Sequence, residues 1–181
     1  MNRRLWCGLL AIALTGCTNP LQSNATTPSP SATATPSLTP TPVPSPTTVN
    51  GRIIVSPVDP NGGAVVAAIL FPPSGAECGV TGKYDACPVT DGLAARLDAG
   101  QINLCRCQNP YQSRTITTTP LPPDNPGVIA HVVLDFGGGN TAKLDVTILQ
   151  TANGWFASDT SCTGQDPQAT SIYASTPPLC G

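Results

Sequence analysis

The chain has 181 residues, 40% of them hydrophobic, and a formal net charge of −2 at pH 7. All ten acidic residues and six of the eight basic residues fall within residues 51–181, which gives that part a net charge of −4. Nucleic acid is excluded as a partner, because a protein that binds it needs clustered lysine and arginine and the sequence has no such cluster.

The first residues have the pattern of an export signal. Arg3 and Arg4 precede the largely apolar residues 5–14, a stretch that is too short to span a membrane, since a transmembrane helix needs about 20 residues. The following Leu14-Thr15-Gly16-Cys17 resembles the lipobox of bacterial lipoproteins. This resemblance implies that residues 1–16 are a signal peptide, that Cys17 carries acyl chains such as palmitate, and that the protein is extracytoplasmic and anchored to the cell membrane by lipid. The alternative is an ordinary secretory signal in which Cys17 is incidental.

The composition changes after Cys17. The 33 residues from position 18 to position 50 include eight prolines, nine threonines and five serines, and none of them is charged. Proline removes backbone donors and short hydroxylated side chains bury little apolar area, so this segment cannot build a core. We therefore predict that residues 17–50 are the lipidated cysteine and a disordered stalk, up to about 90 Å long in a polyproline conformation. Residues 51–181 are predicted to form a single globular domain.

In the first half of this domain we expect one short strand and two short helices. Residues 52–56 have strand composition. The apolar block at residues 61–71 favours a short buried helix, because it contains several alanines and is followed by two prolines. Residues 91–99 have the pattern of a helix whose N-cap is Thr90.

The second half predicts an antiparallel meander. Residues 113–119 have strand composition. Apolar and polar side chains then alternate over residues 128–136 and again over residues 142–149, which is the period of a strand with one buried face. Asn153-Gly154 predicts a two-residue turn that leads into a third strand at residues 155–160.

The glycine-rich loop at residues 137–140 leaves two registers open for the middle hairpin. The apolar faces of its strands coincide only if the loop contains three or five residues. A five-residue loop places Asp135 opposite Lys143, and a three-residue loop places His131 opposite Asp145. We expect the five-residue loop, because it forms a favourable cross-strand charge pair.

The cysteines of the domain predict a disulfide framework. There are six, an even number that suggests up to three bridges in an oxidising compartment: Cys78, Cys87, Cys105, Cys107, Cys162 and Cys180. We expect a bridge between the first two, and long links from the middle two to the last two. The alternatives are a zinc site or a redox dithiol, but Cys105-Arg106-Cys107 has one intervening residue where those motifs have two.

Two small helices followed by a meander resemble the nuclear transport factor 2-like, or cystatin-like, fold. The matching positions are Tyr84 with residues 88–90, residues 93–97 ahead of the sheet, and Gly154-Trp155 near its end. The resemblance implies an α+β class, with short helices packed on a curved antiparallel sheet and stapled by disulfides; the alternative is an all-β sandwich. In that fold a cone-shaped pocket between helices and sheet serves catalysis, ligand binding or pairing with another subunit.

Few residues are candidates for chemistry. His131, the only histidine, falls on the polar face of its strand and is expected at the surface. No ligand spacing indicates a metal or a cofactor, and no motif indicates a catalytic residue. A strict turn at Asn153-Gly154 would place Asp159 across from Ile148 and point it, with Trp155, into a pocket where desolvation makes a carboxylate a general base. The alternative is that Asp159 lies at a frayed strand end, or that a bulge turns it outward.

Three functions remain open. The prediction is a surface-anchored, non-catalytic domain that binds a small ligand or an envelope protein and is held off the membrane by the stalk. The first alternative is a small enzyme that uses Asp159 as a general base, and the second is a disulfide-rich protease inhibitor or structural surface protein. A ligand-sized cavity between helices and sheet would support the first function, and a rigid exposed loop at residues 79–86 would favour an inhibitor.

Overall fold

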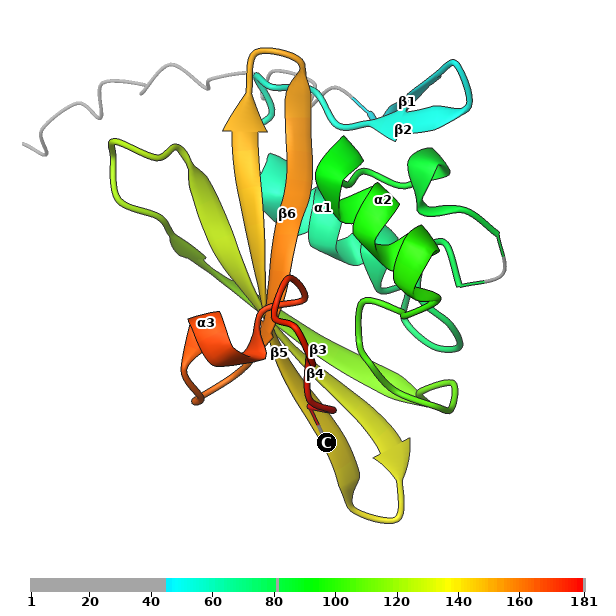
Figure 1. Cartoon of the computed structure of the whole chain (residues 1–181). Helices are drawn as coiled ribbons and strands as arrows, with labels where there is room; N and C mark the ends of the chain where they lie inside the picture. Colours follow the sequence, from blue (N-terminus) through cyan, green and yellow to red (C-terminus); the bar gives the residue numbers. More distant parts are fainter. Residues whose placement is uncertain (1–44, 81, 181) are drawn as a thin grey trace, which may run out of the picture. The chain divides into compact units, whose positions relative to one another are not determined.

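The computed structural model describes residues 45–80 and 82–180 (Figure 1). The predicted signal peptide, Cys17 and the stalk up to residue 44 lie outside the described residues. The described residues belong to one compact unit, Thr41–Gly181. Within this part of the chain, no helix has the length and apolar character needed to cross a membrane.

A four-stranded antiparallel sheet forms the centre of this unit. Its strands follow the chain order β3 (Ser113–Pro120), β4 (Gly127–Gly137), β5 (Asn140–Thr151) and β6 (Gly154–Cys162). The strands that the sequence pattern predicts are confirmed, since every second residue is buried in the central parts of β4 and β5. The strands twist relative to one another, as Figure 1 shows, so the sheet is curved.

The two predicted helices are confirmed. They are α1 (Gly62–Leu70) and α2 (Asp91–Gly100). The hydroxyl of Thr90 caps α2, because it accepts a hydrogen bond of 3.3 Å from the backbone amide of Leu93. Helix α1 packs across the sheet and contacts all four of its strands.

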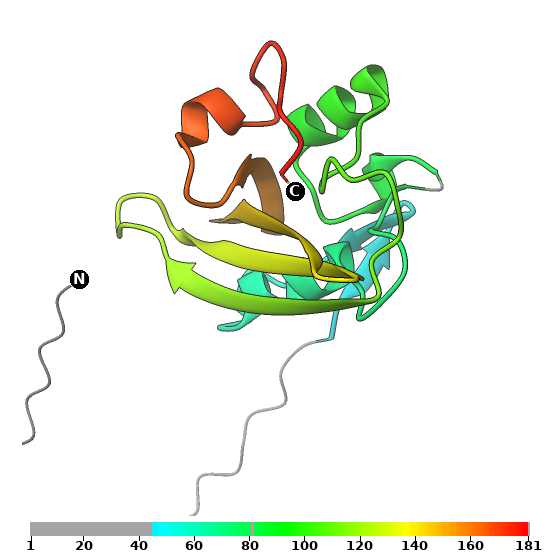
Figure 2. The same ribbon diagram turned by 90° about the horizontal axis from the view of Figure 1, so that it is seen from below.

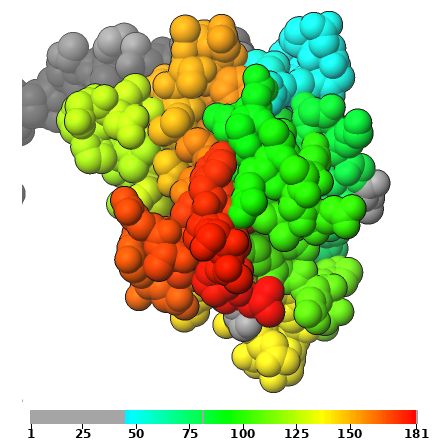
Figure 3. All heavy atoms as spheres, viewed as in Figure 1, coloured from blue at the N-terminus to red at the C-terminus, as the bar shows by residue number. Residues whose placement is uncertain are grey.

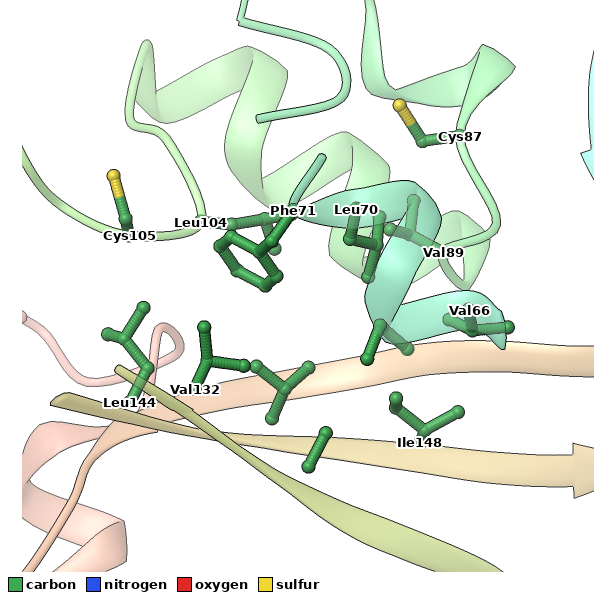
Figure 4. Close-up of a cluster of buried hydrophobic side chains, with 14 of the residues drawn as sticks. Val66, Leu70, Phe71, Cys87, Val89, Leu104, Cys105, Val132, Leu144 and Ile148 are labelled. Atoms are coloured by element: carbon green, nitrogen blue, oxygen red, sulfur yellow. The ribbon is translucent and has the colours of Figure 1, made fainter. Parts of the chain in front are cut away.

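The core lies between the helices and the buried face of the sheet. Figure 4 shows side chains of α1 and of the following residue pointing toward those of the strands. The approach is close because Gly62 lies against the indole ring of Trp155, where a Cβ atom would overlap the ring. The large side chains that are fully buried include Leu70, Phe71, Leu97, Leu104, Leu134, Leu144 and Ile148. Short helices on a curved antiparallel sheet are the mixed class that the sequence predicts.

The register of the hairpin between β4 and β5 differs from the prediction. His131 lies opposite Asp145, and Asp135 does not lie opposite Lys143. The three-residue alternative therefore holds, and the preferred five-residue loop is wrong. The glycines at residues 137–139 all have positive φ, between 64° and 85°, which lets the chain reverse within three residues.

The turn before β6 is shifted by one residue from the predicted position. Thr151 pairs with Gly154, so residues 152–153 form the turn. A bulge follows, and it places Asp159 opposite Thr147, one residue away from the predicted partner. The structure of β6 thus agrees with the alternative in which a bulge turns Asp159 outward. The prediction of a strict two-residue turn that points Asp159 toward the core is wrong.

A second, two-stranded sheet precedes α1. β1 (Thr47–Val49) pairs with β2 (Arg52–Ile54), which confirms the short strand expected there. Because β1 lies within the residues that the sequence assigns to the stalk, regular structure begins before residue 51. Arg52 holds this hairpin against α2 through an ion pair with Asp91, with 2.7 Å between Nη1 and Oδ1.

The end of the chain packs beside β6 and α2. α3 (Pro167–Thr170) contacts β6, and the short helix η1 (Tyr84–Ala86) contacts α2. Arg96 of α2 donates hydrogen bonds of 3.0 Å to the backbone carbonyls of Ile172 and Ala174. Figures 2 and 3 show the C-terminal segment lying between α2 and α3 as a result.

The six cysteines lie in three pairs at disulfide distance, in agreement with a disulfide-stapled domain. The predicted pair Cys78 and Cys87 has a Cα separation of 6.1 Å. It closes the loop that carries η1 and joins that loop to the core, where Cys87 is fully buried.

The long disulfide links predicted for the other four cysteines are wrong. Cys105 pairs with Cys107, and Cys162 pairs with Cys180, at Cα separations of 5.2 Å and 5.1 Å. The first pair meets because Arg106, between the two cysteines, adopts a φ of 51° and folds the chain back on itself. The second pair meets because the C-terminal segment returns to the end of β6.

Candidate functional site

Three surface hollows meet at residues 106–109, and Cys107 and Gln108 line all three. One of them has a volume of about 300 Å³, and both Cys105 and Cys107 line it. We call this hollow the cysteine cleft. Its other walls include Glu77, Val80, Asn103, Asn109, Pro110 and Tyr111.

The wall of the cysteine cleft contains a buried carboxylate. Glu77 is only 5% exposed. It accepts hydrogen bonds from the hydroxyl of Tyr84 at 2.6 Å, from the backbone amide of Cys105 at 2.8 Å and from the backbone amide of Leu104. Burial raises the pKa of Glu77 to about 7, although these hydrogen bonds act in the opposite direction. The group therefore exchanges a proton near neutral pH.

Two tyrosines border Glu77 and stay neutral. Burial raises the pKa of Tyr84, and the negative charge of Glu77 raises it further. The same two causes raise the pKa of Tyr111 to about 12. Glu77 is thus the group at this cleft that changes charge near neutral pH.

Asn103 fixes the backbone around the second cysteine. Its Oδ1 accepts a hydrogen bond of 3.1 Å from the amide of Cys107, and its Nδ2 donates one of 2.7 Å to the carbonyl of the same residue. Oδ1 also lies 3.7 Å from the sulfur of Cys105. The Cys105–Cys107 disulfide closes a ring with one residue between its cysteines. The side chain of Asn103 contacts both cysteines and therefore holds this ring in place.

Arg106 fastens this ring to the rest of the domain. Its side chain turns inward and is only 6% exposed. It donates a hydrogen bond of 2.6 Å to the carbonyl of Thr170 and longer ones, of 3.5 Å, to the carbonyl and hydroxyl of Thr160. Burial lowers the pKa of Arg106, while the charge of Asp159 raises it.

The structure does not bring the two predicted pocket residues, Trp155 and Asp159, together. Trp155 packs in the core against Gly62 at the start of α1. Asp159 faces α3, where it accepts hydrogen bonds from the hydroxyl of Ser171 at 2.8 Å and 2.9 Å and from the amide of Ile172 at 3.2 Å. Core side chains fill the space between the helices and the sheet, where the predicted cone-shaped pocket would lie.

His131 lies in a row of polar side chains across the outer face of the sheet. Its Nδ1 is 2.8 Å from Oδ1 of Asp145, and its Nε2 contacts the hydroxyl of Thr119 at 2.5 Å. The order of hydroxyl, imidazole and carboxylate is that of a catalytic triad. However, Thr119 is exposed on the edge strand β3, and none of the three residues lines a hollow described above. We interpret the row as a surface network that joins three strands.

Sequence reasoning missed Glu77 and Asn103. A signal for the first was available, because Glu77 is the only glutamate in the chain and directly precedes a cysteine. Its burial and its link to residues 104–105 depend on tertiary structure. Within residues 45–80 and 82–180, no group of three histidine, cysteine or acidic side chains is arranged to hold a metal ion.

No protein-family model, no curated protein and no solved structure matches this chain.

Proposed function

We propose that this protein is a lipid-anchored extracytoplasmic lipoprotein whose folded domain binds a segment of an envelope protein in the cysteine cleft. The lipobox-like residues 14–17 and the uncharged stalk support the anchor. Three cysteine pairs at disulfide distance suit an oxidising compartment outside the cytoplasm.

The observation that carries the binding proposal is the make-up of the cysteine cleft. Gln108 and Asn109, which are exposed, present side-chain amides that both donate and accept hydrogen bonds and so match the peptide groups of an extended segment. Val80 and Pro110 add apolar surface beside them. A cleft of about 300 Å³ with mixed walls suits a short stretch of a partner chain.

The resemblance to the cystatin-like fold places a ligand pocket between helices and sheet. Because core side chains occupy that space, we place the proposed site at the edge of the domain, at residues 103–110. The enzyme alternative has less support, since Asp159 is engaged by Ser171 and lines an open hollow beside α3. The inhibitor alternative keeps a candidate site, because residues 80, 82–83 and 85–86 of the loop between the first two cysteines are exposed while Tyr84 is buried.

The anchor is tested by expressing the full chain and its Cys17→Ser variant in bacteria that are fed labelled palmitate. We expect label and membrane association for the unchanged chain, and neither for the variant. Recovery of the unchanged chain without label would refute the anchor.

The binding site is tested with a photo-reactive amino acid at Gln108 in the full chain, in living cells. Gln165, which is exposed and lies outside the cleft, is the matched control. We expect a discrete cross-linked protein from position 108 and none from position 165. Equal cross-linking from the two positions would refute the cleft as the binding site.

A further inference from the structure

We propose that the Cys105–Cys107 disulfide is an exchangeable redox bond, in which a partner thiolate attacks Cys107 and Cys105 leaves with a proton from Glu77. This inference rests on the proposed function, because it adds a reaction between the cleft and the partner segment that occupies it. The partner supplies the electrons, as a protein dithiol of the cell envelope.

The position of this disulfide separates it from the other two. Both of its cysteines line the cysteine cleft, whereas neither of the other pairs lines one of the three hollows described above. Cys105 is 2% exposed, and Cys107 is half-buried. Because Cys107 is the less buried of the two, we assign its sulfur as the one that a thiolate in the cleft attacks, with the sulfur of Cys105 as the leaving group.

Of the three disulfides, this one closes the shortest loop and so restricts the unfolded chain the least. Its cysteines are 2 residues apart in the sequence, against 9 and 18 residues for the other pairs. A disulfide stabilises a fold more when it closes a longer loop, so this one contributes the least to stability. Arg106 is also held at a φ of 51°, a conformation that is unfavourable for residues other than glycine.

Glu77 provides the proton that the leaving group needs. Its carboxylate accepts a hydrogen bond from the backbone amide of Cys105, in the same wall of the cleft. Its pKa of about 7 leaves a substantial fraction of the carboxyl group protonated near neutral pH. The titratable groups beside it, Tyr84 and Tyr111, stay neutral there. Besides Glu77, the charges that act on these tyrosines are Asp98 on Tyr84 and Arg114 on Tyr111.

The reaction balances in two exchange steps. In the first, the partner's thiolate forms a bond to the sulfur of Cys107, the Cys105–Cys107 bond breaks, and Cys105 takes up the proton of Glu77. In the second, the partner's other thiolate attacks the partner sulfur of the mixed disulfide and releases Cys107 as a thiolate, which is protonated from water. Two electrons pass from the partner dithiol to the Cys105–Cys107 pair, and Glu77 regains its proton from water.

The first test uses the purified full chain in its oxidised form and glutathione as the probe thiol. Samples are alkylated at intervals, and mass spectrometry locates the modified cysteines. We expect Cys105 and Cys107 to be reduced or glutathionylated roughly tenfold faster than the other four. Reduction of this pair at the same rate as the others, or more slowly, would overturn the inference.

The direction of attack is tested with two matched variants. Cys105→Ser keeps the accessible thiol and is expected to form a stable mixed disulfide with oxidised glutathione. Cys107→Ser keeps the buried thiol and should react roughly tenfold more slowly. Equal rates in the two variants would overturn the assignment of Cys107 as the attacked sulfur.

The role of Glu77 is tested with the variant Glu77→Gln, which removes the proton and keeps the shape of the side chain. At about pH 6 we expect exchange with glutathione to be several-fold slower in the variant, with no difference at about pH 9, where Glu77 is ionised. Parallel pH profiles would overturn this role. If the disulfide does not exchange but position 108 still cross-links to a partner, only this inference is refuted. If position 108 does not cross-link, the binding proposal is refuted.

Discussion

Oε2 of Glu77 accepts a hydrogen bond of 2.8 Å from the backbone amide of Cys105. This hydrogen bond connects the buried carboxylate of Glu77 to the Cys105–Cys107 disulfide, which closes the shortest loop of the three. Both groups line the cysteine cleft. Since the pKa of Glu77 is raised to about 7, a change of pH near neutrality alters the charge beside that ring. This relationship predicts consequences for stability as well as for exchange.

The stability of the domain should depend on the proton of Glu77. The pKa of this group is about 7 in the folded state and 4.5 as its ordinary value, so the folded state holds the proton more tightly. The stabilisation is complete below pH 4.5 and is lost as the pH rises through about 7. Its full size is about 3 kcal/mol.

The measurement is urea denaturation of the oxidised protein at pH 4.5 and at pH 7.5, with Glu77→Gln as the control. The free energy of unfolding of the unchanged protein should fall relative to that of the variant between these two pH values. A difference between the two proteins that is the same at both pH values would contradict the account.

Helix α1 should tolerate no side chain at its first residue. In Gly62→Ala the new Cβ atom overlaps the indole ring of Trp155, and the overpacking should cost about 1–3 kcal/mol. Gly92→Ala in α2 is the matched control, because its Cβ atom would meet only the hydroxyl of Tyr173, at 3.6 Å. We expect the control to be neutral or stabilising by up to about 1 kcal/mol. Thermal unfolding of both variants makes the comparison, and equal melting temperatures would refute the close packing.

Arg106 should hold the C-terminal segment in place. In Arg106→Ala the carbonyl of Thr170 loses its donor and the carbonyl of Thr160 loses one of its two, which should cost roughly 2 kcal/mol. Hydrogen exchange of the amide of Ile172 should become faster, because it donates to the same carbonyl of Thr160. Lys143→Ala, at an exposed position, is the control. Unchanged protection of Ile172 in the Arg106 variant would rule out this anchoring role.

The strands and helices could be predicted from the sequence, because each depends on residues that are close together in the chain. The alternation at residues 128–136 and 142–149 reports which face of a strand is buried, and Thr90 caps a helix by contacts within four residues. The register between those strands was not predictable from charge. An exposed ion pair between Asp135 and Lys143 is worth less than about 1 kcal/mol, so turn geometry and packing set the register instead.

The candidate site was the least predictable part of the molecule. Six cysteines allow about 15 pairings, and spacing alone does not choose among them. The pairing of Cys105 with Cys107 depends on the φ of Arg106, which is held by contacts with Thr160 and Thr170 from a distant part of the chain. The burial of Glu77 likewise follows from the packing of residues 104–105 onto it.

The most direct test of the account is the disulfide connectivity of the protein isolated from its own envelope. Free thiols are blocked at low pH, the chain is digested without reduction, and linked peptides are identified by mass spectrometry. The account predicts linkage of Cys105 to Cys107, together with Cys78 to Cys87 and Cys162 to Cys180. A peptide that links Cys105 or Cys107 to Cys162 or Cys180 would contradict it.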